Sequence, residues 1–285
     1  MTKRSAILVG TASLLATACV RNPYELTNRS YRQQAKQLAQ QIQAQPTLAG
    51  DSLPPTPFWV GTTNFNLRKP NYVIIHHTAQ HSTEQTLKTF TLPKTQVSAH
   101  YVIGRDGQTY HMLNDYLRAW HGGAARWGNV TDINSVSIGI ELDNDGSEPF
   151  QPAQLASLLK VLGGLKRTYN IPAANIIGHG DIAPTRKSDP SALFPWQQLA
   201  ARGYGLWYDA AVLTDTTAAP FAADSLGQPL PGLTPREALR IIGYDVQDLP
   251  AAIVAFKRHF IQTDVSPVLT EQDRRILYNL YRKFL

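Results

Sequence analysis

The spacing of apolar residues alternates between that of β-strands and that of α-helices, and this alternation constrains the fold more than any other feature of the chain. Residues 72–76 (Tyr-Val-Ile-Ile-His) form an apolar run typical of a buried strand. Ser82 and Gln85 give a capping-box pattern that begins a helix reaching toward Phe90. Between residues 155 and 169, apolar side chains recur every three or four positions, which predicts an amphipathic helix covering a sheet. Strands interspersed with helices predict an α/β layer domain.

Two further strand patterns lie between these predicted helices. Residues 101–103 and 109–112 flank residues 104–107 (Gly-Arg-Asp-Gly), a strong signal for a β-hairpin. Residues 136–142 (Val-Ser-Ile-Gly-Ile-Glu-Leu) alternate apolar with small or polar side chains. Because successive side chains of a strand point to opposite faces, Glu141 is predicted to project away from the face that packs, where it is free for chemistry.

The first 19 residues have the arrangement of an export signal. Lys3 and Arg4 precede the apolar run 6–15, and the small residues 16–18 lead to Cys19, the single cysteine of the chain. This ending resembles a bacterial lipobox, although Ala16 replaces the usual leucine. We therefore predict a signal peptide over residues 1–18 and a lipid-anchored Cys19. The alternative is a plain secretory peptide with an incidental cysteine. Without a second cysteine the mature chain forms no internal disulfide, so core and metal must stabilise it.

Composition changes divide the exported chain into segments. Residues 19–57 are rich in glutamine and then proline, which predicts a flexible tether after the lipid anchor. Residues 58–208 hold the α/β domain, and residues 209–231, dominated by Thr, Ala, Ser and Pro, predict a linker. Residues 232–285 carry apolar residues on one face of each of three predicted helices, which indicates a small three-helix bundle.

Histidine and acidic residues of the α/β domain suggest a metal site. His76 and His77 are adjacent in an extended segment, so their side chains face opposite ways and only one can readily join a site. His179 follows an apolar pair, and Asp189 precedes a proline, which favours an extended backbone that puts Lys187 and Asp189 on the same side. Two histidines and a carboxylate can bind zinc and leave its fourth position open. By spacing alone, hydrogen-bonded or exposed histidines explain the pattern as well.

A longer pattern links this chain to a known family. In order along the chain, its segments are VIIHHTA (73–79), SAHYVIGRDG (98–107), AWHGG (119–123), SIGIELDNDG (137–146) and IIGHGDIAPTRKSDP (176–190). Together they resemble the N-acetylmuramoyl-L-alanine amidases of the zinc amidase family, which also includes T7-type phage lysozymes and peptidoglycan recognition proteins. Residues 233–285 resemble the helical peptidoglycan-binding domain of the lipoprotein members. The resemblance implies a mixed central β-sheet flanked by helices, followed by that helical domain.

By motif position, the resemblance implies that His76, His179 and Asp189 bind one Zn²⁺ per chain, and it selects His76 over His77. It places Glu141 at the catalytic carboxylate and Lys187 at the residue that stabilises the developing oxyanion. Lys187 could instead only orient Asp189. In the remaining motif, Trp120 and His121 are candidate substrate contacts, with a core tryptophan and a capping histidine as the alternative. The tyrosine that phage enzymes often carry before the HYVIGRDG-like segment is replaced by Ala99.

The implied function is hydrolysis of the amide between the lactyl group of peptidoglycan, or of muropeptides including anhydro-muropeptides, and the first L-alanine of the stem peptide. A non-catalytic peptidoglycan receptor and a wall-tethering lipoprotein are the alternatives. The net charge of +6, which falls to +4 without Lys3 and Arg4, suits an anionic polymer. Export argues against nucleic acid as the partner. We expect a monomer in the periplasm, anchored by lipid to the outer membrane of a Gram-negative bacterium.

Overall fold

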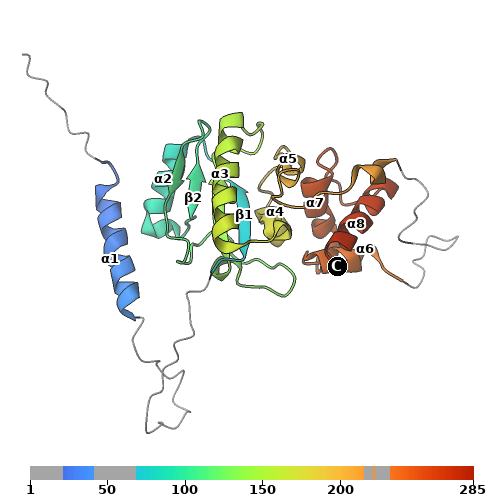
Figure 1. The fold of residues 1–285 in the computed structure, drawn as a ribbon, viewed down its shortest axis with the longest axis horizontal. Helices are drawn as coiled ribbons and strands as arrows, with labels where there is room; N and C mark the ends of the chain where they lie inside the picture. Colours follow the sequence, from blue (N-terminus) through green and yellow to red (C-terminus); the bar gives the residue numbers. More distant parts are fainter. Residues whose placement is uncertain (1–21, 42–68, 215–220, 222–231) are drawn as a thin grey trace, which may run out of the picture. The chain divides into compact units, whose positions relative to one another are not determined.

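The computed structural model describes residues 22–41, 69–214, 221 and 232–285 (Figure 1). The chain divides into two compact units, Met1–Phe65 and Asn66–Leu285. In the first unit, the glutamine-rich stretch forms helix α1 (Glu25–Gln41). The predicted signal peptide, Cys19 and the proline-rich end of the predicted tether lie outside the described residues. No helix in the described part of the chain is long and apolar enough to cross a membrane.

The second unit is built on a five-stranded mixed sheet in the order β3-β2-β4-β1-β5. Its strands are β1 (Tyr72–His77), β2 (Tyr101–Ile103), β3 (Thr109–His111), β4 (Ser137–Leu142) and β5 (Ile176–Gly178). Strand β4 is central and pairs in parallel with β2 and β1, β1 pairs in parallel with β5, and β3 is antiparallel to β2 as the predicted hairpin requires. The α/β fold with a mixed central sheet is therefore confirmed.

The helices of this unit are α2 (Thr83–Thr91), α3 (Pro152–Tyr169), α4 (His179–Ile182), α5 (Trp196–Ala200), α6 (Pro235–Ile242), α7 (Leu249–Phe260) and α8 (Glu271–Lys283). Short 3-10 turns are η1 (Pro93–Thr95), η2 (Ile133–Ser135), η3 (Ala173–Asn175) and η4 (Ala210–Leu213). Ser82 caps α2 as predicted, because its side chain accepts the backbone N–H of Gln85 at 3.1 Å. The predicted amphipathic helix is α3, which Figure 1 shows running alongside strand β1.

The two faces of the sheet bury two separate cores. One face carries Val73, Ile75 and Ile140, and it packs on Leu158 and Leu162 of α3. The opposite face carries Ile74 and Ile177, which lie in one apolar cluster with buried residues of α6, α7 and α8. By the alternation of side chains along β1 and β4, His76 and Glu141 belong to this second face. These two polar residues therefore lie on the same face as the apolar core that the C-terminal helices complete.

The three C-terminal helices form where the sequence places them. Thr234 caps α6 with a reciprocal hydrogen bond to Glu237, and Gly243 ends the helix with a φ of 134°. A side chain at Gly243 would meet the Trp127 ring, since its Cβ would lie 2.4 Å from a ring carbon. Most of the predicted linker 209–231 lies outside the described residues, but Phe221 is buried and contacts Tyr278 edge to face. These helices therefore share their core with the sheet.

Candidate active site

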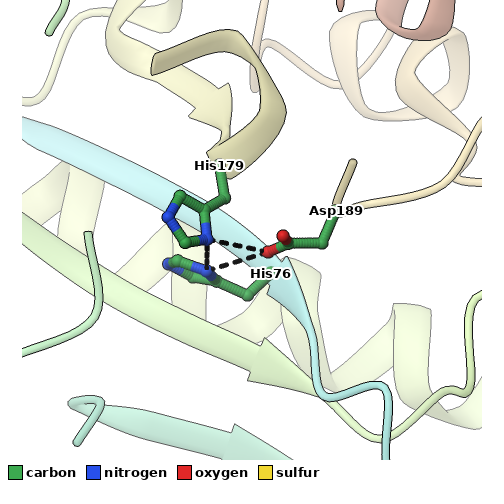
Figure 2. A group of neighbouring side chains, drawn as sticks. All are labelled: His76, His179 and Asp189. Carbon is green, nitrogen blue, oxygen red and sulfur yellow. Dashed lines mark hydrogen bonds and ion pairs between the residues drawn. The ribbon is translucent and has the colours of Figure 1, made fainter. Parts of the chain in front are cut away.

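Three side chains from distant parts of the sequence meet at the carboxyl end of strand β1. His76 lies near the end of β1, His179 begins α4, and Asp189 lies in the segment that follows α4. Figure 2 shows both rings turned toward the carboxylate. The His76 Nδ1 lies 2.9 Å from the His179 Nδ1, and the Asp189 Oδ2 lies 3.1 and 3.0 Å from these two nitrogens. All three residues are buried.

Hydrogen bonds on the far sides of the rings decide where the imidazole protons lie. Ser137 donates its hydroxyl proton to the Ile133 carbonyl at 2.7 Å, so it accepts from the Nε2–H of His121 at 3.1 Å. The other nitrogen of His121, Nδ1, then accepts from the Nε2–H of His76 at 3.1 Å. For the second ligand, the His179 Nε2–H donates to the Gly122 carbonyl at 3.0 Å. Each of the two candidate ligand nitrogens therefore presents a lone pair.

These lone pairs and the carboxylate fit a metal cation. Two nitrogen lone pairs and an anionic oxygen about 3 Å apart repel one another unless positive charge lies between them. Tetrahedral zinc with ligands at 2.0–2.1 Å separates its donor atoms by ~3.3 Å, close to the observed triangle. Among the residues that the structure describes, His76, His179 and Asp189 are the one group able to hold a metal ion in this way. Burial, followed by the charge of His179, lowers the pKa of His76 to about 4 and keeps the ring neutral, as a ligand must be.

Glu141 stands beside the candidate ligands because of the strand register. It pairs with His76 across β1 and β4, and its Oε1 lies 3.9 Å from the His76 Nδ1. The side chain is buried, and Oε2 has no hydrogen-bond partner among the described residues. Burial and the negative charge of Asp189 raise the pKa of Glu141 to about 8, against the opposing effect of Lys187. A carboxyl group in this range can both accept and release a proton near neutral pH.

Lys187 lies in the segment between the candidate ligands His179 and Asp189. Its backbone N–H donates to the Ala183 carbonyl at 2.9 Å, and its side chain is half-buried. Its positive charge acts on both Glu141 and His76, lowering the pKa of each. Lys187 therefore supplies positive charge close to the carboxylates.

His77 faces the other side of the sheet, as strand alternation predicts. Its Nδ1 accepts the backbone N–H of Ser191 at 3.2 Å, two residues beyond Asp189. Gly146 makes room for the ring, since a Cβ there would lie 2.7 Å from the His77 Cε1. His77 thus anchors the segment that carries Asp189.

Trp120 and His121 are adjacent in sequence but lie in different environments. The Trp120 side chain is 51% exposed. Its backbone N–H donates to the Ser98 hydroxyl oxygen at 2.9 Å, and its carbonyl accepts the Ser98 backbone N–H at 3.0 Å. His121 is buried between His76 and Ser137. The exposed indole can contact a ligand directly, whereas the buried imidazole contacts the candidate metal ligand His76.

Sequence reasoning missed three residues of this site. Ser137 and Gly139 share the strand face of Glu141, and alternation alone could have singled them out. A Cβ at Gly139 would lie 2.5 Å from the His121 Cγ, so glycine is needed where the ring packs on the strand. Arg186 donates to the carbonyls of Gly122 and Ala124 at 2.6 and 2.9 Å, which holds the loop beside His179. No sequence signal marked Arg186.

Comparison with known proteins gives a consistent result. Residues 66–192 match the family model described as N-acetylmuramoyl-L-alanine amidase. The amidase AmiD of Escherichia coli is 34% identical over 213 residues, which cover 67% of this chain and 75% of that protein. The 1,6-anhydro-N-acetylmuramyl-L-alanine amidase AmpD of Haemophilus influenzae is 38% identical over 104 residues, 36% of this chain and 56% of that protein.

Solved structures extend the likeness beyond the sheet domain. A complex of Escherichia coli AmiD with the substrate anhydro-N-acetylmuramic acid-L-Ala-D-γ-Glu-L-Lys matches with a TM-score of 0.66 and 30% identity, over 78% of this chain and 93% of that one. AmpDh3 of Pseudomonas aeruginosa matches with a TM-score of 0.67 and 26% identity, over 83% and 99% of the two chains. The shared structure therefore includes C-terminal helices as well as the sheet.

Proposed function

Since this chain belongs to the N-acetylmuramoyl-L-alanine amidase family, we propose that it is a zinc-dependent hydrolase that cuts the lactyl–L-alanine amide of peptidoglycan and muropeptides. The observation that carries the proposal is the triangle of two imidazole lone pairs and one carboxylate oxygen beside the unpaired Glu141 oxygen. A binding protein has no need for a buried carboxyl group whose pKa lies near neutrality next to a metal site.

We propose that His76, His179 and Asp189 hold one Zn²⁺. Bound there, zinc would supply Lewis-acid chemistry, making water a stronger nucleophile and polarising the scissile carbonyl. The protein contributes three ligands and leaves one position for the reaction, as catalytic zinc sites do. His121, Ser137 and the Gly122 carbonyl hold the imidazoles in the tautomer that binding requires.

Glu141 is the proposed acid and base of the reaction. It would take a proton from the attacking water and deliver it to the leaving alanine nitrogen, which its raised pKa permits. Lys187 would offset the negative charge that develops on the carbonyl oxygen. Exposed Trp120 would provide an apolar surface for the sugar or the lactyl group.

We propose that anhydro-muropeptides are among the substrates, in keeping with a role in cell-wall turnover and recycling. The solved complexes of the two structural relatives hold an anhydromuramyl tripeptide and an anhydromuramic pentapeptide. We further propose that the chain acts as a monomer in the periplasm, held to the outer membrane by lipid on Cys19. That part of the proposal is supported by the sequence of residues 1–19 alone.

Metal removal tests the proposal directly. Chelation should abolish hydrolysis of a defined anhydro-muropeptide, measured by mass spectrometry of the products, and Zn²⁺ should restore it. Replacing His76, His179 or Asp189 with alanine should each lower zinc occupancy, because each removes one of three ligands. The matched control is His77→Ala, which alters the neighbouring histidine on the other face and should lower occupancy far less. Full activity after verified zinc removal would refute the metal mechanism, and zinc binding without turnover would favour a receptor.

A further inference from the structure

Asp181 is a buried carboxylate between the candidate metal segment and the C-terminal helices. It is 3% exposed and lies two residues after His179. Its Oδ2 accepts the backbone N–H of Gly178 at 2.7 Å, which caps α4. Its remaining hydrogen bonds come from the C-terminal helical region, from the Tyr244 hydroxyl to Oδ1 at 2.8 Å and from the His259 Nδ1 to Oδ2 at 2.7 Å.

The position of Asp181 determines the direction in which His179 points. Helix α4 spans only one turn, from His179 to Ile182, so its start depends on the cap that Asp181 gives to Gly178. Two residues after Gly178, the backbone N–H of Gly180 donates to the Asp189 carbonyl at 2.7 Å. One turn of helix thus fixes both later ligands, and Asp181 fixes that turn.

Helix α7 and the short segment after it hold the same segment at further points. The ring of His259 stacks on Trp196 with centroids 3.9 Å apart and an interplanar angle of 15°. Beyond the helix, Gln262 donates to the Phe194 carbonyl at 2.6 Å. The segment from His179 to Trp196, which contains Asp189, is therefore held from its outer side by the C-terminal region.

These contacts have the character of a permanent interface. Tyr244 and His259 are 2% and 4% exposed, so neither has water available if Asp181 moves away. A buried polar group that loses its partner costs about 1–3 kcal/mol, and more when the partner is charged. Around the three residues, the apolar cluster of α6, α7 and α8 is continuous with Ile74, Ile177 and Ile182 of the sheet domain.

We propose that Tyr244 and His259 are positioning residues of the metal site, so that the C-terminal helices form part of the catalytic machinery as well as any wall-binding surface. They act through Asp181 and touch neither metal nor substrate. The inference rests on the zinc site proposed above. It predicts that removing either hydrogen bond loosens His179 and weakens zinc binding, with the polypeptide still folded.

The test compares matched variants of the full chain by zinc affinity, measured by competition with a chromophoric chelator, and by kcat and KM on an anhydro-muropeptide. Tyr244→Phe removes only the hydroxyl that bonds Asp181 and should weaken zinc binding about 3–10-fold, less than the 10–100-fold typical of partners bonded directly to ligands. We expect kcat to fall with little change in KM. Tyr278→Phe, which removes a hydroxyl in the same core away from Asp181, is the control and should match the parent.

Two further comparisons separate positioning from a general loss of stability. His259→Leu should weaken zinc binding, whereas His259→Asn, which keeps a donor near the place of Nδ1, should retain most of the affinity. In Asp181→Ala with Tyr244→Phe, the zinc affinity should equal that of Asp181→Ala alone, because Asp181→Ala already removes the oxygen that accepts the Tyr244 hydroxyl. If the loss of zinc affinity in the double variant equalled the product of the two single fold-losses, the inference would be overturned.

Zinc binding and hydrolysis by the unmutated parent chain test the proposed function separately from the positioning role. A parent chain that neither binds zinc nor hydrolyses the muropeptide would refute both. A zinc-binding, active parent whose affinity is unchanged by Tyr244→Phe and His259→Leu would refute the positioning role alone. Folding of every variant is checked by circular dichroism before zinc is measured.

Discussion

At the scale of single residues, the site depends on where each proton is held. The Ser137 hydroxyl donates to the Ile133 carbonyl and therefore accepts the Nε2–H of His121. The Nδ1 of His121 then accepts the Nε2–H of His76, which leaves the Nδ1 of His76 without a proton and able to bind a metal. Burial keeps the chain of contacts neutral, because it lowers the pKa of His121 well below its usual value. The tautomer of a proposed metal ligand is thus set by a serine that contacts it only through His121.

Glu141→Gln tests the proposed acid and base. The substitution is nearly isosteric and keeps the three candidate ligands, so folding and zinc content should stay close to those of the parent. Turnover of a muropeptide should fall by about 10²–10⁴-fold, the usual contribution of a positioned general acid or base. Zinc content, circular dichroism and initial rates are measured on the same preparation. Hydrolysis within about threefold of the parent would assign Glu141 a structural role.

The same variant tests the raised pKa of Glu141 through the stability of the zinc-free protein. A carboxyl group with a pKa of 4.5 in the unfolded chain and about 8 in the folded one holds its proton more tightly when folded. Between these values the folded state binds more protons, so the free energy of unfolding falls as pH rises. We expect the parent to lose stability relative to Glu141→Gln over this range in urea titrations of chelated protein. Parallel stability curves would show that the pKa is not raised.

Strand alternation predicted much of this site, and its limit is visible at neighbouring residues. It shows that His76 and His77 face opposite ways but not which face receives His179, because that depends on how β5 pairs with β1. Only the resemblance selected His76. His121 follows no periodic element, so its burial between His76 and Ser137 depends on packing that sequence periodicity does not contain.

At the scale of elements, local signals were sufficient wherever a segment is long or explicitly capped. The hairpin, α2, α3 and the three C-terminal helices follow from turn residues, caps and apolar periodicity. The one-turn helix α4 has no such pattern, since a segment of four residues is too short for periodicity. Its cap comes from Asp181, whose other partners, Tyr244 and His259, lie more than 60 positions away.

Removing the C-terminal helices tests how far the two predicted domains depend on each other. A chain ending at Tyr208 would expose Ile74, Ile177 and Ile182, among other buried residues of the shared core. Each such side chain contributes about 1.5–3 kcal/mol when buried, and together they approach the roughly 5–15 kcal/mol net stability of a protein. We expect the truncated chain to aggregate or to lose its cooperative thermal transition in circular dichroism.

The matched control for this truncation starts at residue 58 and keeps the whole second unit. It should melt cooperatively and elute as a compact species in gel filtration. A chain ending at Tyr208 that melts like this control would show that the sheet domain is stable alone, as expected of a domain joined to its neighbour by a flexible linker.

At the scale of the whole molecule, the composition of the sequence suggested separate modules, whereas the packing joins two of them. A Thr-, Ala- and Pro-rich stretch predicts a linker from its polar composition, but that composition does not show whether the elements on either side of it touch. The apolar faces of α6, α7 and α8 could cover one another or the sheet, and the structure has them do both. Such a choice between partners of equal hydrophobicity is decided by shape, which composition does not encode.

The final prediction concerns the membrane anchor, which depends on Cys19, outside the described residues. Acyl chains bind a bilayer with about 0.8 kcal/mol per buried CH₂ group, so lipid on this cysteine would hold the enzyme at a membrane surface without a spanning helix. Cys19→Ser should abolish incorporation of labelled palmitate and leave the protein as precursor or mislocalised in fractionated cells. Ala16→Leu, which restores the leucine usual at that position, is the control and should incorporate label at least as well as the parent. Equal labelling of Cys19→Ser and the parent would refute lipidation at this cysteine, and the protein would then be expected free in the periplasm after cleavage of a plain secretory signal.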